Sequence, residues 1–118
     1  MQGFDFSQVR RQLALAGWPG RIGSDGTLTL VPTVKNQRRD DLRAVWGADD
    51  QGNLYCDLGQ VHGHAAGFDV LAALATNIPC APGSEVHVAG KIASLMASKV
   101  ATLARSHPAP VPILAMTA

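Results

Sequence analysis

The sequence predicts an α+β fold in which an antiparallel sheet of four to five short strands packs with three helices. Two patterns support this prediction. Apolar residues recur at helical spacing near both ends of the chain, whereas apolar and polar residues alternate through 21–58. A period of 3.6 residues is typical of helices, and a period of two is typical of strands with one buried face. The length of 118 residues suits a single domain.

The N-terminal helix has the clearest boundaries. Asp5 is the expected N-cap, and Gln8 stands where the second residue of a capping box is found. Gly17 is expected to end the helix in the left-handed conformation, and Pro19 prevents its continuation. The apolar residues that share one helical face are Phe6, Val9, Leu13 and Ala16.

The middle of the chain is predicted to form an antiparallel meander. The turn sequence Ser24-Asp25-Gly26 separates two short strands, and the polar segments 35–41 and 48–53 are expected to be loops. Alternating apolar residues on either side of these loops predict the remaining strands. The predicted strands are 21–22, 27–31, 42–46 and 54–58.

The next segment is predicted to form a central helix followed by a short strand. Residues 65–76 are almost wholly apolar, which is typical of a helix buried within a domain or at an interface. Val86 and Val88 alternate with polar residues, so 85–88 is expected to be a strand with both valines inward.

A long C-terminal helix is predicted over 91–106, and Gly90 is expected to open it. Three prolines follow the helix, so the end of the chain is expected to be extended. These boundaries predict a single α+β domain over 1–107 and a proline-rich tail over 108–118.

Charge and hydropathy limit the classes of partner. The formal net charge is +1, so we expect no strong general attraction to nucleic acid or to a membrane. No segment approaches the ~18 consecutive apolar residues of a membrane helix. The first residues lack a basic segment followed by an apolar run, so we expect no signal peptide. The sequence therefore predicts a cytoplasmic protein in which Cys56 and Cys80 are reduced thiols.

His62 and His64 are the candidate metal ligands. Two neutral imidazoles two residues apart are able to reach one metal ion, and glycines surround this pair. A full ligand set with fixed spacing is missing, so two exposed loop histidines are the competing interpretation. A metal-dependent enzyme that uses both residues is one hypothesis for the function.

Two partial matches to enzyme motifs fail at the residues that carry the chemistry. The segment from His64 to Cys80 looks similar to the cytidine-deaminase signature. In that family a glutamate shuttles protons and a second cysteine binds the metal. Ala66 and Gly83 stand at these two positions here, which excludes that mechanism. Gly90 and its following lysine lack the glycine and the hydroxyl residue that complete a phosphate loop. We therefore expect no cofactor.

A basic segment is the candidate nucleic-acid contact. Its cations are Lys35, Arg38, Arg39 and Arg43, and such side chains on a loop suit contacts to phosphates. The adjoining Asp40 and Asp41 cancel part of the positive field. A solvated surface segment is the competing interpretation.

Small residues on the last helix and apolar residues in the tail are the candidate protein interface. The interface residues are Ala93, Ala97, Ala101, Ile113 and Leu114. Small side chains let another backbone approach closely, which suits a homodimer formed through the C-terminal helix. Packing on the domain's own central helix explains the same alanines.

The function that these features favour is non-catalytic. We expect a small interaction protein that acts as an adaptor, an inhibitor or an accessory subunit by binding another protein or itself. The first alternative is a nucleic-acid-binding accessory protein that uses the basic segment 35–43. The second alternative is the metal-dependent enzyme described above.

Overall fold

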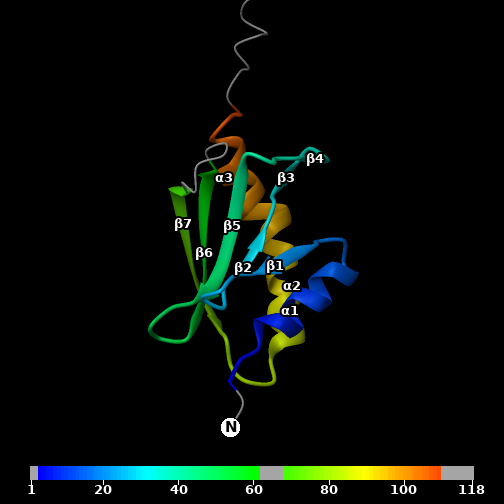
Figure 1. The fold of residues 1–118 in the computed structure, drawn as a ribbon, viewed down its shortest axis with the longest axis vertical. Helices are drawn as coiled ribbons and strands as arrows, with labels where there is room; N and C mark the ends of the chain where they lie inside the picture. The colour runs from blue at the N-terminus through cyan, green and yellow to red at the C-terminus, as the bar shows by residue number, and fades with distance from the viewer. Residues whose placement is uncertain (1–2, 62–67, 110–118) are drawn as a thin grey trace, which may run out of the picture.

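Five strands form one antiparallel sheet in the order β1-β2-β5-β6-β7 (Figure 1). The computed structural model of the chain describes residues 3–61 and 68–109. A separate two-stranded hairpin follows β2 in the chain. The strands are β1 (Gly20–Ile22), β2 (Leu28–Leu30), β3 (Thr33–Val34), β4 (Gln37–Arg38), β5 (Leu42–Ala48), β6 (Asn53–Val61) and β7 (Phe68–Pro79).

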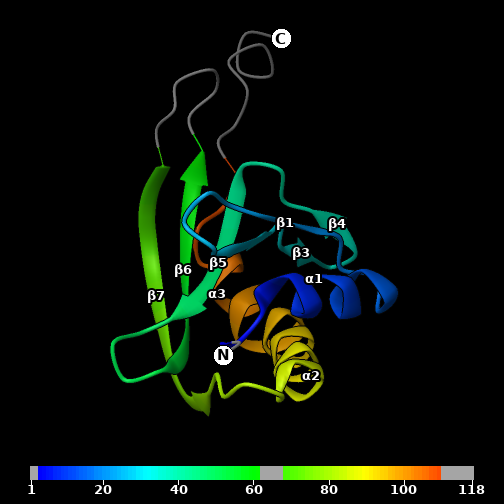
Figure 2. The same cartoon turned by 60° about the horizontal axis from the view of Figure 1, so that its bottom comes forward.

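The helices lie on one face of this sheet, and its other face is not covered by a helix (Figure 2). They are α1 (Phe6–Leu15), α2 (Glu85–Leu95), the π-helical segment η1 (Met96–Val100) and α3 (Ala101–Arg105). The backbone stays right-handed helical across both junctions, so α2, η1 and α3 run on as one helix. The α+β class, the antiparallel sheet and the two terminal helices are therefore confirmed.

Asp5 and Gly17 mark the two ends of α1, as predicted. The expected capping box with Gln8 is not formed, because the backbone N–H of Asp5 donates to Glu85 instead. The Asp5 carboxylate accepts a hydrogen bond from the backbone N–H of Ser7 at 2.9 Å. Gly17 adopts a φ of 89°, and the N–H of Trp18 returns to the carbonyl of Leu13 at 2.8 Å. A left-handed residue at this place is favourable for glycine and strained for other residues.

The prediction of a central helix over 65–76 is wrong, because the chain from Phe68 onward forms strand β7. Residues 65–67 lie outside the described part of the chain. A short apolar run suits a buried helix and a strand equally well, so its periodicity does not decide between them. Pairing with β6 decides it here: Leu74 turns toward the helices, and Ala73 turns toward the uncovered face.

The prediction of a strand over 85–88 is also wrong, because Glu85 begins α2. Val88 is fully buried whereas Val86 is 58% exposed, so the two valines point in different directions. The Glu85 carboxylate accepts a hydrogen bond from the backbone N–H of Asp5 at 3.0 Å, which joins the starts of both helices. Gly90 consequently lies inside α2 and does not open the helix.

The C-terminal helix buries one row of side chains that repeats every fourth residue. Each member of this row is 0% exposed: Val88, Ile92, Met96, Val100 and Ala104. In an α-helix, a step of four residues turns about 40° past a full circle, so such a row drifts around the axis. The wider turn of η1 takes up part of this drift. We infer that the four-residue spacing is the reason for the π-helical segment.

The predicted polar loop 35–41 contains a tight hairpin instead. Lys35 and Asn36 have φ values of 52° and 64° and connect β3 to β4. Two successive residues with positive φ make the turn whose twist matches a two-residue hairpin. This hairpin brings β3 beside α3.

No helix in the described ranges combines the length and the apolarity that a membrane crossing requires. The buried residues of both helices and of β2, β5 and β6 form one hydrophobic core. Trp46 is its largest fully buried side chain, and its indole N–H has no hydrogen-bond partner among the described residues.

Replacing Met96 by alanine should lower the free energy of unfolding by about 2–5 kcal/mol, because a fully buried side chain leaves a cavity against the sheet. Urea denaturation measures this change. Lys91→Ala is the matched control on the exposed side of the same helix and should change stability by less than about 0.5 kcal/mol. If both variants lost the same unfolding free energy, the row that contains Met96 would not be the buried face of the helix.

Candidate functional site

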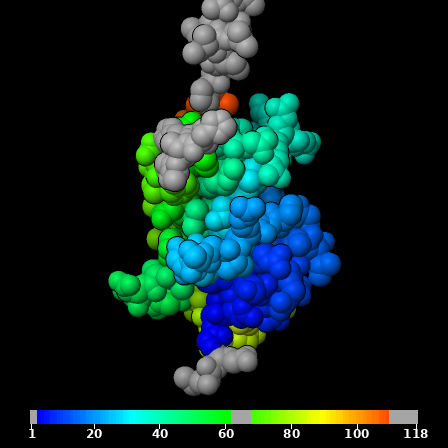
Figure 3. Space-filling view, viewed as in Figure 1, coloured from blue at the N-terminus to red at the C-terminus, as the bar shows by residue number. Residues whose placement is uncertain are grey.

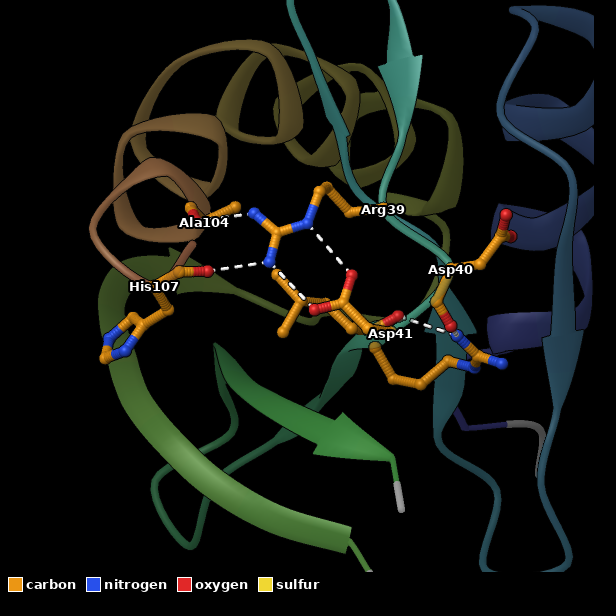
Figure 4. Close-up of polar contacts among 7 residues, drawn as sticks. Arg39, Asp40, Asp41, Ala104 and His107 are labelled. Atoms are coloured by element: carbon orange, nitrogen blue, oxygen red, sulfur yellow. Dashed lines mark hydrogen bonds and ion pairs between the residues drawn. The ribbon is translucent and has the colours of Figure 1, made fainter. Parts of the chain in front are cut away.

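Arg39 joins the start of β5 to the end of the C-terminal helix (Figure 4). Its Nε and Nη2 donate to the two carboxylate oxygens of Asp41 at 2.9 and 2.8 Å. Nη1 donates to the carbonyl of Ala104 at 3.0 Å, and Nη2 also donates to that of His107 at 2.6 Å. The Ala104 carbonyl also accepts from the backbone N–H of His107 at 3.1 Å, so the guanidinium adds a second hydrogen bond there and ties the residues just after the helix to the sheet.

This junction is shielded from solvent and electrostatically coupled. The side chains of Arg39 and Asp41 are only 13% and 23% exposed. The hydrogen bonds from Arg39 lower the pKa of the Asp41 carboxyl against the opposing effect of burial. The matched pair one residue earlier, Arg38 and Asp40, is 59% and 73% exposed. Arg39 is one of the four predicted nucleic-acid contacts. Its guanidinium binds groups within the fold and is therefore not available to a phosphate.

The other predicted basic residues separate into two places. Arg38 and Arg43 line one hollow of about 300 Å³ on the uncovered face, together with Arg21 from β1. Lys35 lines a different hollow, of about 240 Å³, beside the C-terminal helix. Sequence reasoning did not include Arg21, because its position depends on strand pairing. Arg21 lies opposite Thr29 of β2, and Thr29 lies opposite Val45 of β5.

Two aromatic rings lie across glycines on the uncovered face. The ring of Tyr55 on β6 covers Gly47 of β5, where an added Cβ would lie 2.9 Å from the phenol oxygen. The ring of Phe68 on β7 covers Gly59 of β6 in the same way, and Phe68 remains 39% exposed. Tyr55 is directly opposite Gly47, whereas Phe68 reaches Gly59 diagonally, and in both cases a ring covers backbone that the glycine leaves bare.

A second candidate site is a groove between strand β7 and the C-terminal helix. The groove has a volume of about 410 Å³ and is lined by Ala73, Leu74, Ser98, Lys99, Thr102 and Leu103. It coincides with η1, and π-helical segments inside α-helices often occur at functional sites. We call this feature the β7 groove.

The predicted interface alanines have different surroundings. Ala93 is half-buried and lines a hollow with Gln12 and Leu13 of α1 and with Ala16 just after it, so part of the strip packs on the domain's first helix. Ala101 is half-buried beside Val34 of β3, and Ala97 between them is exposed. The remaining predicted interface residues, Ile113 and Leu114, lie outside the described residues.

The predicted metal ligands His62 and His64 lie outside the described residues. Within 3–61 and 68–109, no group of three or more histidine, cysteine, aspartate or glutamate side chains is placed to hold a metal ion. Burial raises the pKa of the Cys56 thiol to about 12, and it also raises that of Cys80. Both cysteines are free, and at neutral pH neither has the thiolate character of an activated nucleophile.

The Arg39 junction should contribute far more to stability than its exposed neighbour. Arg39→Ala removes the guanidinium partner of the Asp41 carboxylate and the side-chain hydrogen bonds to the carbonyls of Ala104 and His107. It should lower the free energy of unfolding by about 2–3 kcal/mol. Arg38→Ala removes an exposed pair and should cost less than about 1 kcal/mol. Urea denaturation at neutral pH measures both. Equal costs would show that Arg39 is not a structural junction.

The same junction predicts a pH dependence. Because the folded-state pKa of Asp41 is lowered, its contribution to stability is complete above the unfolded value of about 3.9 and is lost as the pH falls through the folded value. The difference in unfolding free energy between wild type and Asp41→Asn should be constant from about pH 7 to 5 and should shrink below about pH 4. Denaturation curves across this range test it, with Asp40→Asn as the exposed control. If the difference in unfolding free energy between wild type and Asp41→Asn grew as the pH fell, the pKa of Asp41 would not be lowered in the folded state.

The candidate surfaces are thus the arginine hollow on the uncovered face and the β7 groove at the edge of the sheet. Their geometry comes from strand pairing and helix packing within this chain. No family model, no curated protein and no solved structure matches the chain in the three comparisons made.

Proposed function

We propose that this chain is a small non-catalytic interaction protein that binds an extended segment of a partner protein along the open edge of β7. The observation that carries the proposal is the combination of an open strand edge, whose central part has no charge or proline, with the β7 groove beside it. Strand addition to such an edge is a common mode of peptide recognition, in which backbone hydrogen bonds supply affinity and side-chain pockets supply specificity.

The central part of the β7 edge lacks the usual protection, whereas Asp69, Pro79 and two register shifts lie toward its ends. β7 is the last strand of the sheet, and no described strand pairs with its outer side. It forms one margin of the molecule (Figures 1 and 3). Between Val70 and Ile78 the strand has neither a charged residue nor a proline, which are common devices against unwanted pairing. Its register with β6 is regular from Ala72 to Ala75 and shifts on either side of that run.

The β7 groove suits the alternate side chains of an added strand. Leu74 of β7 turns toward the helices, so the side chains of an added strand on that face would enter the groove. Two hydroxyl groups in its wall are already used: Ser98 donates to the carbonyl of Ser94 at 2.8 Å, and Thr102 donates to that of Ser98 at 3.0 Å. The groove therefore favours apolar side chains.

Charge specifies the partner further. Lys99 lines the β7 groove, is exposed, and forms no ion pair with any described residue. An acidic residue on the bound segment would complement it. The partner proposed here is an extended segment with apolar residues at alternate positions and one acidic residue beside them.

Selection from a random library of nine-residue segments tests this function. The enriched sequences should alternate apolar residues and carry an acidic residue, and they should shift the backbone amide signals of 72–75 in NMR spectra. Ser98→Trp fills the β7 groove and should weaken binding by roughly tenfold or more, because it removes the burial of one apolar side chain. Fluorescence anisotropy measures the affinity.

Ser94→Trp is the matched control, since Ser94 lies one turn earlier on the helix and does not line the β7 groove. It should bind the selected segments as wild type does. Segments that bind Ser98→Trp and wild type equally well would refute the proposed site. Sedimentation that shows a dimer, weakened only by Ser98→Trp, would replace the partner segment by a second copy of this chain.

A further inference from the structure

We propose that the hollow lined by Arg21, Arg38 and Arg43 binds the phosphate group of a small phosphorylated ligand. The hollow lies on the uncovered face of the sheet, away from the β7 groove, and it is independent of the proposed function. Three strands supply one arginine each: β1, β4 and β5. Guanidinium groups match the geometry of phosphate oxygens and form strong, charge-assisted hydrogen bonds with them.

Arg43 is held in place before any ligand binds. Its Nη1 donates to the backbone carbonyls of Asp40 and Leu42, at 2.8 Å in each case. No hydrogen bond from its Nε or Nη2 to a described residue is present. The Nη1 atom is therefore fixed by the backbone, and the N–H groups of Nε and Nη2 remain to bind an anion. A group that is already positioned loses little conformational freedom on binding.

Arg21 and Thr29 supply unused donors at the other side of the hollow. The two residues are directly opposite each other in the β1–β2 pair and share the uncovered face. Neither side chain makes a hydrogen bond to a described residue. The guanidinium of Arg21 and the hydroxyl of Thr29 thus line the same hollow as Arg43, from strands β1 and β2, so an anion in the hollow would have donors from three strands.

Arg38 adds a third cation that is only weakly held. Its Nε donates to Asp40 at 2.5 Å, and both members of this pair are mostly exposed. An exposed ion pair contributes little free energy, so a phosphate is able to compete with Asp40 for this guanidinium. Asp40 consequently lowers the affinity of the site for phosphate, but it does not prevent a phosphate from binding.

The charges around the hollow favour a small ligand over a long polyanion. Asp57 lies opposite Val45 on the same face, in the row that also contains Arg21 and Thr29. Burial raises the pKa of Tyr55, and the negative charges of Asp57 and Asp25 raise it further, which places both carboxylates near that ring. A nucleic-acid strand that crossed the face toward the aromatic rings would meet these carboxylates. The volume of about 300 Å³ is also at the small end of ligand sites.

An NMR titration with inorganic pyrophosphate tests the site at constant ionic strength. The backbone amides of Gly20 and Thr29 should shift and saturate in wild type. Arg43→Gln and Arg21→Gln should each weaken the affinity by roughly tenfold or more, since each loses charge-assisted hydrogen bonds. Asp40→Asn should strengthen it by about two- to fivefold, because it releases Arg38.

Arg11→Gln is the matched control, because Arg11 is an exposed arginine of α1 that does not line the hollow. It should bind pyrophosphate as wild type does, and each variant should remain folded at the temperature of the titration, as its melting curve without ligand shows. Equal weakening by Arg11→Gln, or no saturable shift in wild type, would overturn the proposal. Oligothymidylate that binds more tightly than pyrophosphate, with a steep salt dependence, would also overturn it and assign the arginines to a nucleic acid.

Discussion

The row of side chains on the C-terminal helix is the constraint on which the rest of this structure depends. One continuous helical segment has to cover most of one face of the sheet, and it does so with residues spaced every fourth position. An undistorted α-helix would carry that row around its axis and away from the strands. The local π-helical turn keeps the row on the sheet, and the same distortion forms the wall of the β7 groove. Core packing and a candidate binding surface therefore share one cause.

The Arg39 junction explains why a basic segment of the sequence does not form one basic surface. Two Arg–Asp pairs with the same spacing follow each other in the chain, yet Arg39 turns inward to the helix end and Arg38 turns outward. Arg38 then lies with Arg43 on the uncovered face, and Lys35 lies at the tip of the small hairpin. Neighbours in sequence are thus divided between an internal structural contact and two separate surface hollows.

The sequence correctly predicted the elements whose conformation depends on neighbouring residues in the chain. The Asp5 cap and the left-handed Gly17 define α1 within a few residues of chain, and the alternation over 42–46 and 54–58 predicted β5 and β6. The helix predicted over 65–76 is wrong from Phe68 onward, because the conformation of this segment is decided by pairing with β6 and not by its own composition. The arginine hollow has the same origin: Arg21 and Arg43 are far apart in the chain, and only the order of the strands brings them together.

The order of the strands also has a consequence for how the chain folds. Every pair in the main sheet joins strands that follow each other along the chain, and only the small β3–β4 hairpin intervenes, between β2 and β5. Such pairs close short loops, which lose little entropy, so the sheet is able to grow hairpin by hairpin. The contact between Asp5 and Glu85 spans 80 positions and closes the longest loop among the described hydrogen bonds. Docking of the two terminal helices is therefore the step of highest contact order, and it would set the folding rate of this domain.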